Sequence, residues 1–318
     1  MSPATNDWNT ATNWTPETVP DEPTDVATFD VSNITTVSMS NYVTIGAIVF
    51  DANANGYNII AHGALEGMGV VNDSAVTQNV DSSANLSFTG RASAGANIVY
   101  TNNGETPPDG YATVFEDESS AGSATFVNKG DSSGVFAAYM IFEGHASAGT
   151  STIMNESGTA NGAQMSFFGN ATAAHSNITV QPEAYIEFGK NSTADNATLN
   201  IAGGTVQFDQ DANGGKASVV LSDGGAVTFD GHNVEVSPPT LGSLEGEGTV
   251  DLSGQALAIG SNGVNGTFSG VISDGGPLLA LPVDAWPSGA RWIQLLAPSP
   301  VGITRPGLIS KRWWLFPA

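Results

Sequence analysis

Apolar residues recur along the middle of the chain at a regular spacing, and small or polar turn residues separate them. An aromatic residue followed by a small or acidic turn returns at intervals of 27, 27, 26, 20, 20 and 21 residues: Phe88, Phe115, Phe142, Phe168, Phe188, Phe208 and Phe229. A second apolar position follows the first six of these after 10 to 12 residues: Ile98, Phe126, Ile153, Ile178, Leu199 and Val220. The pattern therefore indicates a protein built from short internal repeats.

Each repeat contains two short segments in which apolar and polar residues alternate, for example 185–188 and 197–201. This alternation is typical of β-strands, and Gly, Asn and Asp punctuate the turns between them. A unit of two or three strands cannot bury its own apolar face, but a stack of such units can. The sequence therefore predicts an all-β fold, a right-handed parallel β-helix (solenoid), with residues 61–276 as its repeat body. A β-sandwich also has short strands at this spacing, but its strands need not repeat in phase as these phenylalanines do.

Residues 1–60 depart from the repeat and are predicted to form an atypical N-terminal cap with the first strands. Trp8 and Trp14 precede three prolines, and strand-like segments follow. The terminal repeat of a solenoid must cover an open end. The tryptophans are therefore interpreted as the core of the cap, with a platform for stacking carbohydrate as the alternative.

The last 42 residues, 277–318, have a different composition. They hold four of the six tryptophans and carry a net charge of +3, whereas the first 276 residues, with 30 acidic and four basic side chains, carry −26. No repeat crosses the boundary. Two interpretations remain open: a docking or capping segment, or a chain that leaves its natural frame after Gly276, as in a truncated fragment. The apolar tail, or an open end of the helix, also suggests homo-oligomers.

Charge and composition exclude several classes of function. The acidic body lacks the basic footprint that nucleic-acid binding needs. The absence of cysteine excludes disulfide scaffolds, zinc ribbons and thiol enzymes. No apolar run reaches the length of about 18 residues that a membrane-spanning helix needs. The first residues show no signal peptide, and the Asn/Thr/Ser/Gly-rich composition favours an exported bacterial protein. We therefore expect an extracellular or cell-surface location, with the signal absent from this sequence.

Several segments resemble the passenger proteins of bacterial autotransporters and their associated β-strand repeats. The likeness covers about residues 7–276 and is clearest in the following segments: 8–14 (Trp-Asn-Thr-Ala-Thr-Asn-Trp), 25–29, 45–50, 241–250 and 268–276. The resemblance implies a secreted β-helix displayed on the cell surface, with an adhesive or structural role. It does not imply a particular activity. The translocator barrel that such proteins carry at the C-terminus is not part of this sequence.

Equivalent positions of a parallel β-helix stack about 4.8 Å apart, so the third residue after each aromatic anchor is expected to form a column. With Asn170 in place of its neighbour Ala171, that column is Arg91, Glu118, His145, Asn170, Asn191, Asp211 and His232. The pairs Glu118–His145 and Asp211–His232 each join a carboxylate to an imidazole, which suits acid/base catalysis or a metal. Arg91, Asn170 and Asn191 are candidate ligand-binding residues. The alternative is a solvated edge of polar turn residues.

Two acidic turns share the D-x-[DN]-x-[DN]-G beginning of a calcium loop. Their candidate ligands are Asp51, Asn53 and Asn55 in the first and Asp209, Asp211 and Asn213 in the second. Alternate oxygens in such a loop can converge on calcium or another divalent cation. Both lack the final glutamate, and Asp and Asn are also ordinary turn residues.

Two functions are compatible with these features. The first is an exported β-helix that adheres to, binds or structures a surface, with a carbohydrate or a host or cell-surface ligand as partner. The second is a hydrolase or lyase for an ester, a phosphoester or a polysaccharide, which uses the polar column on the lateral face with or without a metal. A solenoid can host both.

Overall fold

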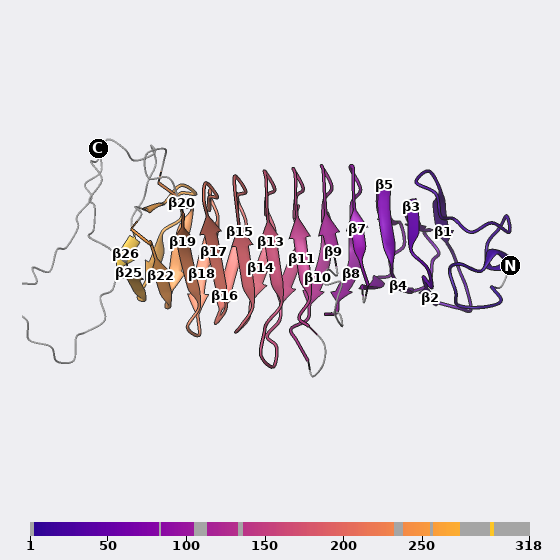
Figure 1. Ribbon diagram of the computed structural model, residues 1–318, viewed down its shortest axis with the longest axis horizontal. Coiled ribbons are helices and arrows are strands. Elements are labelled where there is room, and N and C mark those ends of the chain that lie inside the picture. Colours follow the sequence, from indigo (N-terminus) through magenta and orange to yellow (C-terminus); the bar gives the residue numbers. More distant parts are fainter. Residues whose placement is uncertain are drawn as a thin grey trace, which may run out of the picture.

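The chain winds into a parallel β-solenoid whose turns, or rungs, stack along the long axis of the molecule (Figure 1). This computed structural model describes residues 3–82, 84–104, 113–132, 136–231, 238–254 and 257–273, together with the backbone of 293–295. Each strand pairs in parallel with the strand one rung away. The predicted all-β parallel solenoid is thus confirmed.

Two long sheets form the walls of the solenoid. Within the described residues, sheet 1 has twelve strands: β1 (Val26–Phe29), β3 (Val43–Phe50), β5 (Gly63–Asn72), β7 (Leu86–Phe88), β9 (Thr113–Phe115), β11 (Tyr139–Phe142), β13 (Gln164–Phe167), β15 (Tyr185–Phe188), β17 (Thr205–Asp209), β19 (Ala226–Asp230), β22 (Thr249–Asp251) and β25 (Val271–Ser273). Sheet 2 has twelve more: β2 (Thr36–Ser38), β4 (Asn58–Ile60), β6 (Gln78–Ser82), β8 (Ala96–Asn102), β10 (Ser123–Asn128), β12 (Thr152–Asn155), β14 (Asn177–Val180), β16 (Thr198–Ala202), β18 (Ser218–Ser222), β21 (Ser243–Gly246), β24 (Gly266–Phe268) and β26 (Ile293–Leu295). A short pair, β20 (Thr240–Leu241) and β23 (Ala258–Ile259), and the 3₁₀ turn η1 (Ala11–Asn13) complete the described elements.

A stack of phenylalanine rings runs through the interior behind sheet 1. Neighbouring rings lie 4.6 to 5.2 Å apart between centroids and are nearly parallel: Phe88, Phe115, Phe142, Phe167, Phe188, Phe208 and Phe229. The predicted column is therefore correct except at one rung, where Phe167 and not Phe168 occupies it. The spacings on either side of that rung are 25 and 21 residues, so the sequence pattern had placed the anchor of this rung one residue too late.

A second apolar column lines the interior behind sheet 2. Tyr100 stacks on Phe126 with ring centroids 4.7 Å apart, and aliphatic residues continue the column. Tyr100, rather than the predicted Ile98, pairs with Phe126. Val219, rather than the predicted Val220, pairs with Leu199. In a strand, a shift of one residue moves a side chain to the opposite face.

Buried asparagines form a polar ladder at the ends of three strands of sheet 2. Asn102 donates from Nδ2 to Asn128 Oδ1 at 2.6 Å, and Asn128 donates from Nδ2 to Asn155 Oδ1 at 2.7 Å. Thr113 Oγ1 donates to Asn102 Oδ1 at 2.6 Å. All of these side chains are fully buried. Each rung supplies a hydrogen-bond partner for the next as far as Asn155, whose buried Nδ2 has no partner in the described part of the chain.

A third, narrow side closes each rung between the two sheets. Isolated parallel bridges link one residue per rung along this side: Gly69, Ser93, Ser120, Ser147, Thr172, Thr193 and Asn213. The residues pointing inward here are mainly alanines. Close approach of neighbouring rungs explains Gly149, which has φ +61° and whose missing Cβ would lie 2.4 Å from the Gly122 carbonyl oxygen.

The N-terminal segment packs on the first rung. Trp8 is fully buried, its ring lies 4.8 Å from that of Trp14 and 5.7 Å from that of Phe29, and its backbone bonds to Ser38 of β2. Of the predicted tail 277–318, the structure describes only the backbone of β26, which pairs with β24. No helix in the described part of the chain is long and apolar enough to cross a membrane.

Candidate functional site

The predicted polar column lies on the turns that follow the strands of sheet 1. Its members from Arg91 to Asn191 repeat at equivalent places, since each backbone N–H from the second member onward bonds to a carbonyl of the previous rung: Glu118 to Gly90, His145 to Asp117, Asn170 to Gly144 and Asn191 to Gly169. Asp211 extends the column, because it precedes Asn213 as Asn191 precedes its bridge partner Thr193. All six side chains are exposed. His232 lies outside the described residues, so the predicted pair with Asp211 is not placed.

Contacts within this column are those of a solvated edge. Arg91 donates from Nε to Glu118 Oε2 at 2.8 Å, with the two side chains 83% and 60% exposed. His145 Nε2 lies 3.4 Å from Asn170 Nδ2. Among the described residues, no hydrogen bond joins Glu118 to His145. The carboxylate therefore has a guanidinium as its partner, and the predicted acid/base couple is not assembled here.

The bridge residues beside this column have a structural task. In six successive rungs, the side-chain oxygen accepts a hydrogen bond of 2.8 to 3.1 Å from the backbone N–H two residues on: Ser93, Ser120, Ser147, Thr172, Thr193 and Asn213. Such local bonds stabilise turns. Asn213 therefore takes the place that serine or threonine holds in the other rungs.

This role bears on the second predicted calcium loop. Asn213 Oδ1 also accepts from Thr240 Oγ1 at 2.6 Å, and Asp209 Oδ1 accepts from Gln207 Nε2 at 2.5 Å. Asp211 is exposed on the turn between them. Two of the three candidate ligands thus already bind protein donors.

The first predicted calcium loop behaves similarly. Asn55 Oδ1 accepts from the Ser32 backbone N–H at 2.7 Å, while Asp51 and Asn53 are exposed. Within the described ranges, no group of three or more His, Asp and Glu side chains is placed to hold a metal ion. Calcium binding stays a prediction for both loops.

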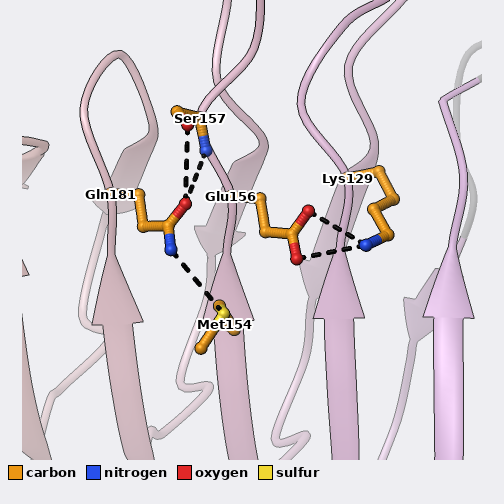
Figure 2. A network of polar contacts seen from close by, with 5 residues as sticks. All are labelled: Lys129, Met154, Glu156, Ser157 and Gln181. Carbon is orange, nitrogen blue, oxygen red and sulfur yellow. Dashed lines mark hydrogen bonds and ion pairs between the residues drawn. The ribbon is translucent and has the colours of Figure 1, made fainter.

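A second charged column follows the strands of sheet 2 and links three rungs (Figure 2). Lys129 Nζ lies 3.1 and 3.0 Å from the two carboxylate oxygens of Glu156. Gln181 accepts at Oε1 from the Ser157 backbone N–H at 3.1 Å, and its Nε2 lies 3.8 Å from the Met154 sulfur. Every polar group drawn there contacts the next rung, so we assign this network to the cohesion of the solenoid.

The outer face of sheet 1 carries an arrangement that the sequence analysis missed. Tyr139 and Tyr185 occupy outward positions of β11 and β15, and both are half-buried. The Tyr139 hydroxyl lies 2.8 Å from Ser166 Oγ of β13, and the Tyr185 hydroxyl donates to Gln207 Oε1 of β17 at 2.7 Å. Each ring therefore extends along the sheet to the next strand. Tyrosines at polar positions of an alternating strand are the sequence signal that could have indicated this face.

Carboxylates adjoin these tyrosines. Burial, and then the nearby Asp209, raise the pKa of the Glu187 carboxyl above its ordinary value. Burial, followed by the Glu187 charge, likewise raises the pKa of the Tyr185 hydroxyl. We call the set Tyr139, Phe168, Tyr185, Glu187 and Gln207 the aromatic face. This face combines aromatic rings with hydrogen-bonding groups on the outer surface of sheet 1.

A hollow of about 450 Å³ at the N-terminal end could also hold a ligand. Trp14, Tyr57, Asn13 and Asp30 are among the residues that line it. Trp8 also borders it, but its Nε1 donates to the Pro20 carbonyl at 3.0 Å within the core. Its burial agrees with the interpretation as cap core, whereas Trp14 is only partly buried.

Comparison of the chain with protein-family models, with curated proteins and with solved structures yielded no match. The likeness to autotransporter-type passengers therefore depends on the sequence motifs and on the solenoid fold alone.

Proposed function

We propose that this chain is the β-helical passenger part of an exported bacterial surface protein and that it binds or adheres through its lateral faces. The observation that carries the proposal is the stack of parallel rungs, which presents two long outer walls (Figure 1). The segments 8–14, 241–250 and 268–276, which resemble those of passenger proteins, support it.

The acidic body supports the same proposal, because a strongly negative surface keeps an exposed, elongated protein soluble. Among the described residues, stacked rings and hydrogen bonds between rungs contribute to the cohesion of the fold.

The location of the protein tests this proposal. Antibodies raised against the purified chain should label intact cells of the source organism or detect the protein in the medium. Brief protease treatment of intact cells should remove the label. Detection only in the cytosolic fraction, with protection from the protease, would contradict surface display.

Hydrolysis is the alternative function, and one observation favours it. Burial and the nearby Asp209 raise the pKa of the Glu187 carboxyl, which makes this group better suited to donate a proton than an ordinary carboxyl. Ester, phosphoester and polysaccharide substrates, each with and without EDTA, provide the test. Turnover that Glu187→Gln abolishes would support the alternative. Turnover no higher than that of heat-treated protein would exclude it.

A further inference from the structure

Three aromatic side chains lie along the outer surface of sheet 1, all reaching in the same direction toward the next rung. Two are Tyr139 and Tyr185, whose hydroxyls bond to the neighbouring strand. The third is Phe168, which follows β13 and covers Gly189 of the next rung. A Cβ on Gly189 would lie 2.9 Å from both Cδ1 and Cε1 of that ring. The glycine therefore leaves the space in which the Phe168 ring lies flat.

These rings pack on the sheet and still meet solvent. Ser166 points outward between the buried Met165 and Phe167, yet it is only 2% exposed. The tyrosine hydroxyl that contacts it accounts for part of this cover. Tyr139 and Tyr185 are half-buried rather than buried, so part of each residue reaches the solvent.

Fixed polar groups lie beside Tyr185. Gln207 accepts from the Tyr185 hydroxyl and donates from Nε2 to Asp209 Oδ1 at 2.5 Å. Glu187 lies on the same strand as Tyr185 and is paired in register with Ser166 on one side and Gln207 on the other. The carboxylate and amide groups are therefore held in place and can exchange hydrogen bonds with hydroxyl groups of a ligand.

Sugar rings have the matching chemistry. A pyranose presents C–H groups on one face, which pack against the electron-rich face of an aromatic ring, and hydroxyls around its edge, which bond to carboxylates and amides. Tyr139, Gln164 and Tyr185 are consecutive register partners. The two tyrosines are therefore two strand spacings, or about 10 Å, apart. This is close to the length of two pyranose units in an extended chain.

The charge of this wall restricts the class of sugar. Glu143, Glu187, Asp209 and Asp230 all lie on or beside the aromatic face. Such a surface repels chains of uronates or sulfated sugars. We propose that the aromatic face binds an uncharged polysaccharide chain that runs along the solenoid axis, across the strands. This inference rests on the proposed binding function and names its ligand class.

Binding of the purified full-length chain to polysaccharides tests the proposal. Insoluble cellulose, chitin and mannan serve in pull-downs, and soluble β-glucan, xylan and polygalacturonate serve in affinity electrophoresis. We expect retention by at least one uncharged polymer and none by polygalacturonate. Phe168→Ala and Tyr185→Ala should each weaken binding about tenfold, the loss of one well-packed ring. Tyr185→Phe keeps the ring and should stay within about threefold of wild type.

Two control variants show whether the loss is specific. Met154→Ala removes an exposed apolar side chain from the outer face of sheet 2, and Trp14→Ala removes a ring that lines the N-terminal hollow. Both should bind like wild type, and circular dichroism should show unchanged strand content in every variant. Three results would overturn the proposal: no binding to any uncharged polymer, wild-type binding by a variant lacking all three rings of the face, or loss of binding in Trp14→Ala. Because the assay uses purified protein, its failure leaves surface display untouched, and a cytosolic location leaves the binding result intact.

Discussion

The register of the phenylalanine stack gives the sharpest test of the fold. Phe167 and Phe168 are adjacent in the sequence, but the structure buries the first completely and leaves the second on the outer surface. Replacing each in turn with alanine removes the same number of atoms. The two variants should differ greatly in stability, because only one of them leaves a gap in the core.

The magnitude follows from the surroundings of each ring. Phe167 has no exposed surface, and its ring centroid lies 4.7 Å from the ring centroids of both Phe142 and Phe188. Truncation of a buried phenylalanine costs about 3 to 5 kcal/mol. Two lost aromatic pairs, each worth about 0.5 to 1.5 kcal/mol, contribute to that figure. Phe168 is half-buried, so its truncation should cost about 1 kcal/mol.

Equilibrium unfolding in urea, followed by far-UV circular dichroism, measures both variants. A double-mutant cycle of Phe142→Leu and Phe167→Leu then isolates the stacking, with an expected coupling of about 1 kcal/mol. Repeat proteins can unfold in segments, so the slope of each transition must match wild type before free energies are compared. If Phe168→Ala destabilises the chain more than Phe167→Ala, the register described here is wrong by one residue.

Other substitutions test the polar features of the solenoid. Asn128→Ala should lower the free energy of unfolding in urea by about 3 kcal/mol, because it leaves the buried Nδ2 of Asn102 and Oδ1 of Asn155 without their hydrogen-bond partner. Glu187→Gln should leave Tm unchanged below pH 4.5, the ordinary pKa of the carboxyl, and raise it progressively at higher pH. The reason is that burial and the neighbouring aspartate raise the folded pKa, so ionisation costs wild-type stability as pH rises through it. Thermal melts from pH 4 to 8 measure the difference. Arg91→Ala should change the free energy of unfolding by less than about 0.5 kcal/mol, because its ion pair is solvent-exposed, and a loss above 2 kcal/mol would show that the column is structural.

The sequence predicted the fold class because the interior of a solenoid repeats. The rungs from β7 to β19 each bury one phenylalanine behind sheet 1, so the anchors return in phase from Phe88 to Phe229. The length of each rung was harder to predict, because loops outside the sheets vary from rung to rung. At β13 the doublet Phe167–Phe168 offered two anchors, and composition alone could not decide between them.

The candidate site was predicted only in its placement. Turn positions are set by the same repeat, so Glu118, His145 and Asn170 do stack as expected. The chemistry of these side chains depends on which neighbouring groups they contact, and the repeat does not determine those contacts. Glu118 pairs backward with Arg91, while His145 lies beside Asn170. The calcium motif alone does not distinguish ligands from turn residues, since Asn213 fits both descriptions, and calcium binding stays a prediction.

The aromatic face could not be derived from the sequence, because its contacts join residues that only an accurate register brings together. Tyr185 meets Gln207, which lies 22 positions later in the sequence, and Tyr139 meets Ser166, which lies 27 positions later. A slip of one residue in either rung would turn the partner inward and remove the contact. The same slip also decides the role of Phe168, which would be a core anchor in the shifted register and is a ring that covers Gly189 in this one. The unfolding measurements and the polysaccharide-binding assays therefore test the same register, because the aromatic face exists only if Phe167, and not Phe168, belongs to the stack.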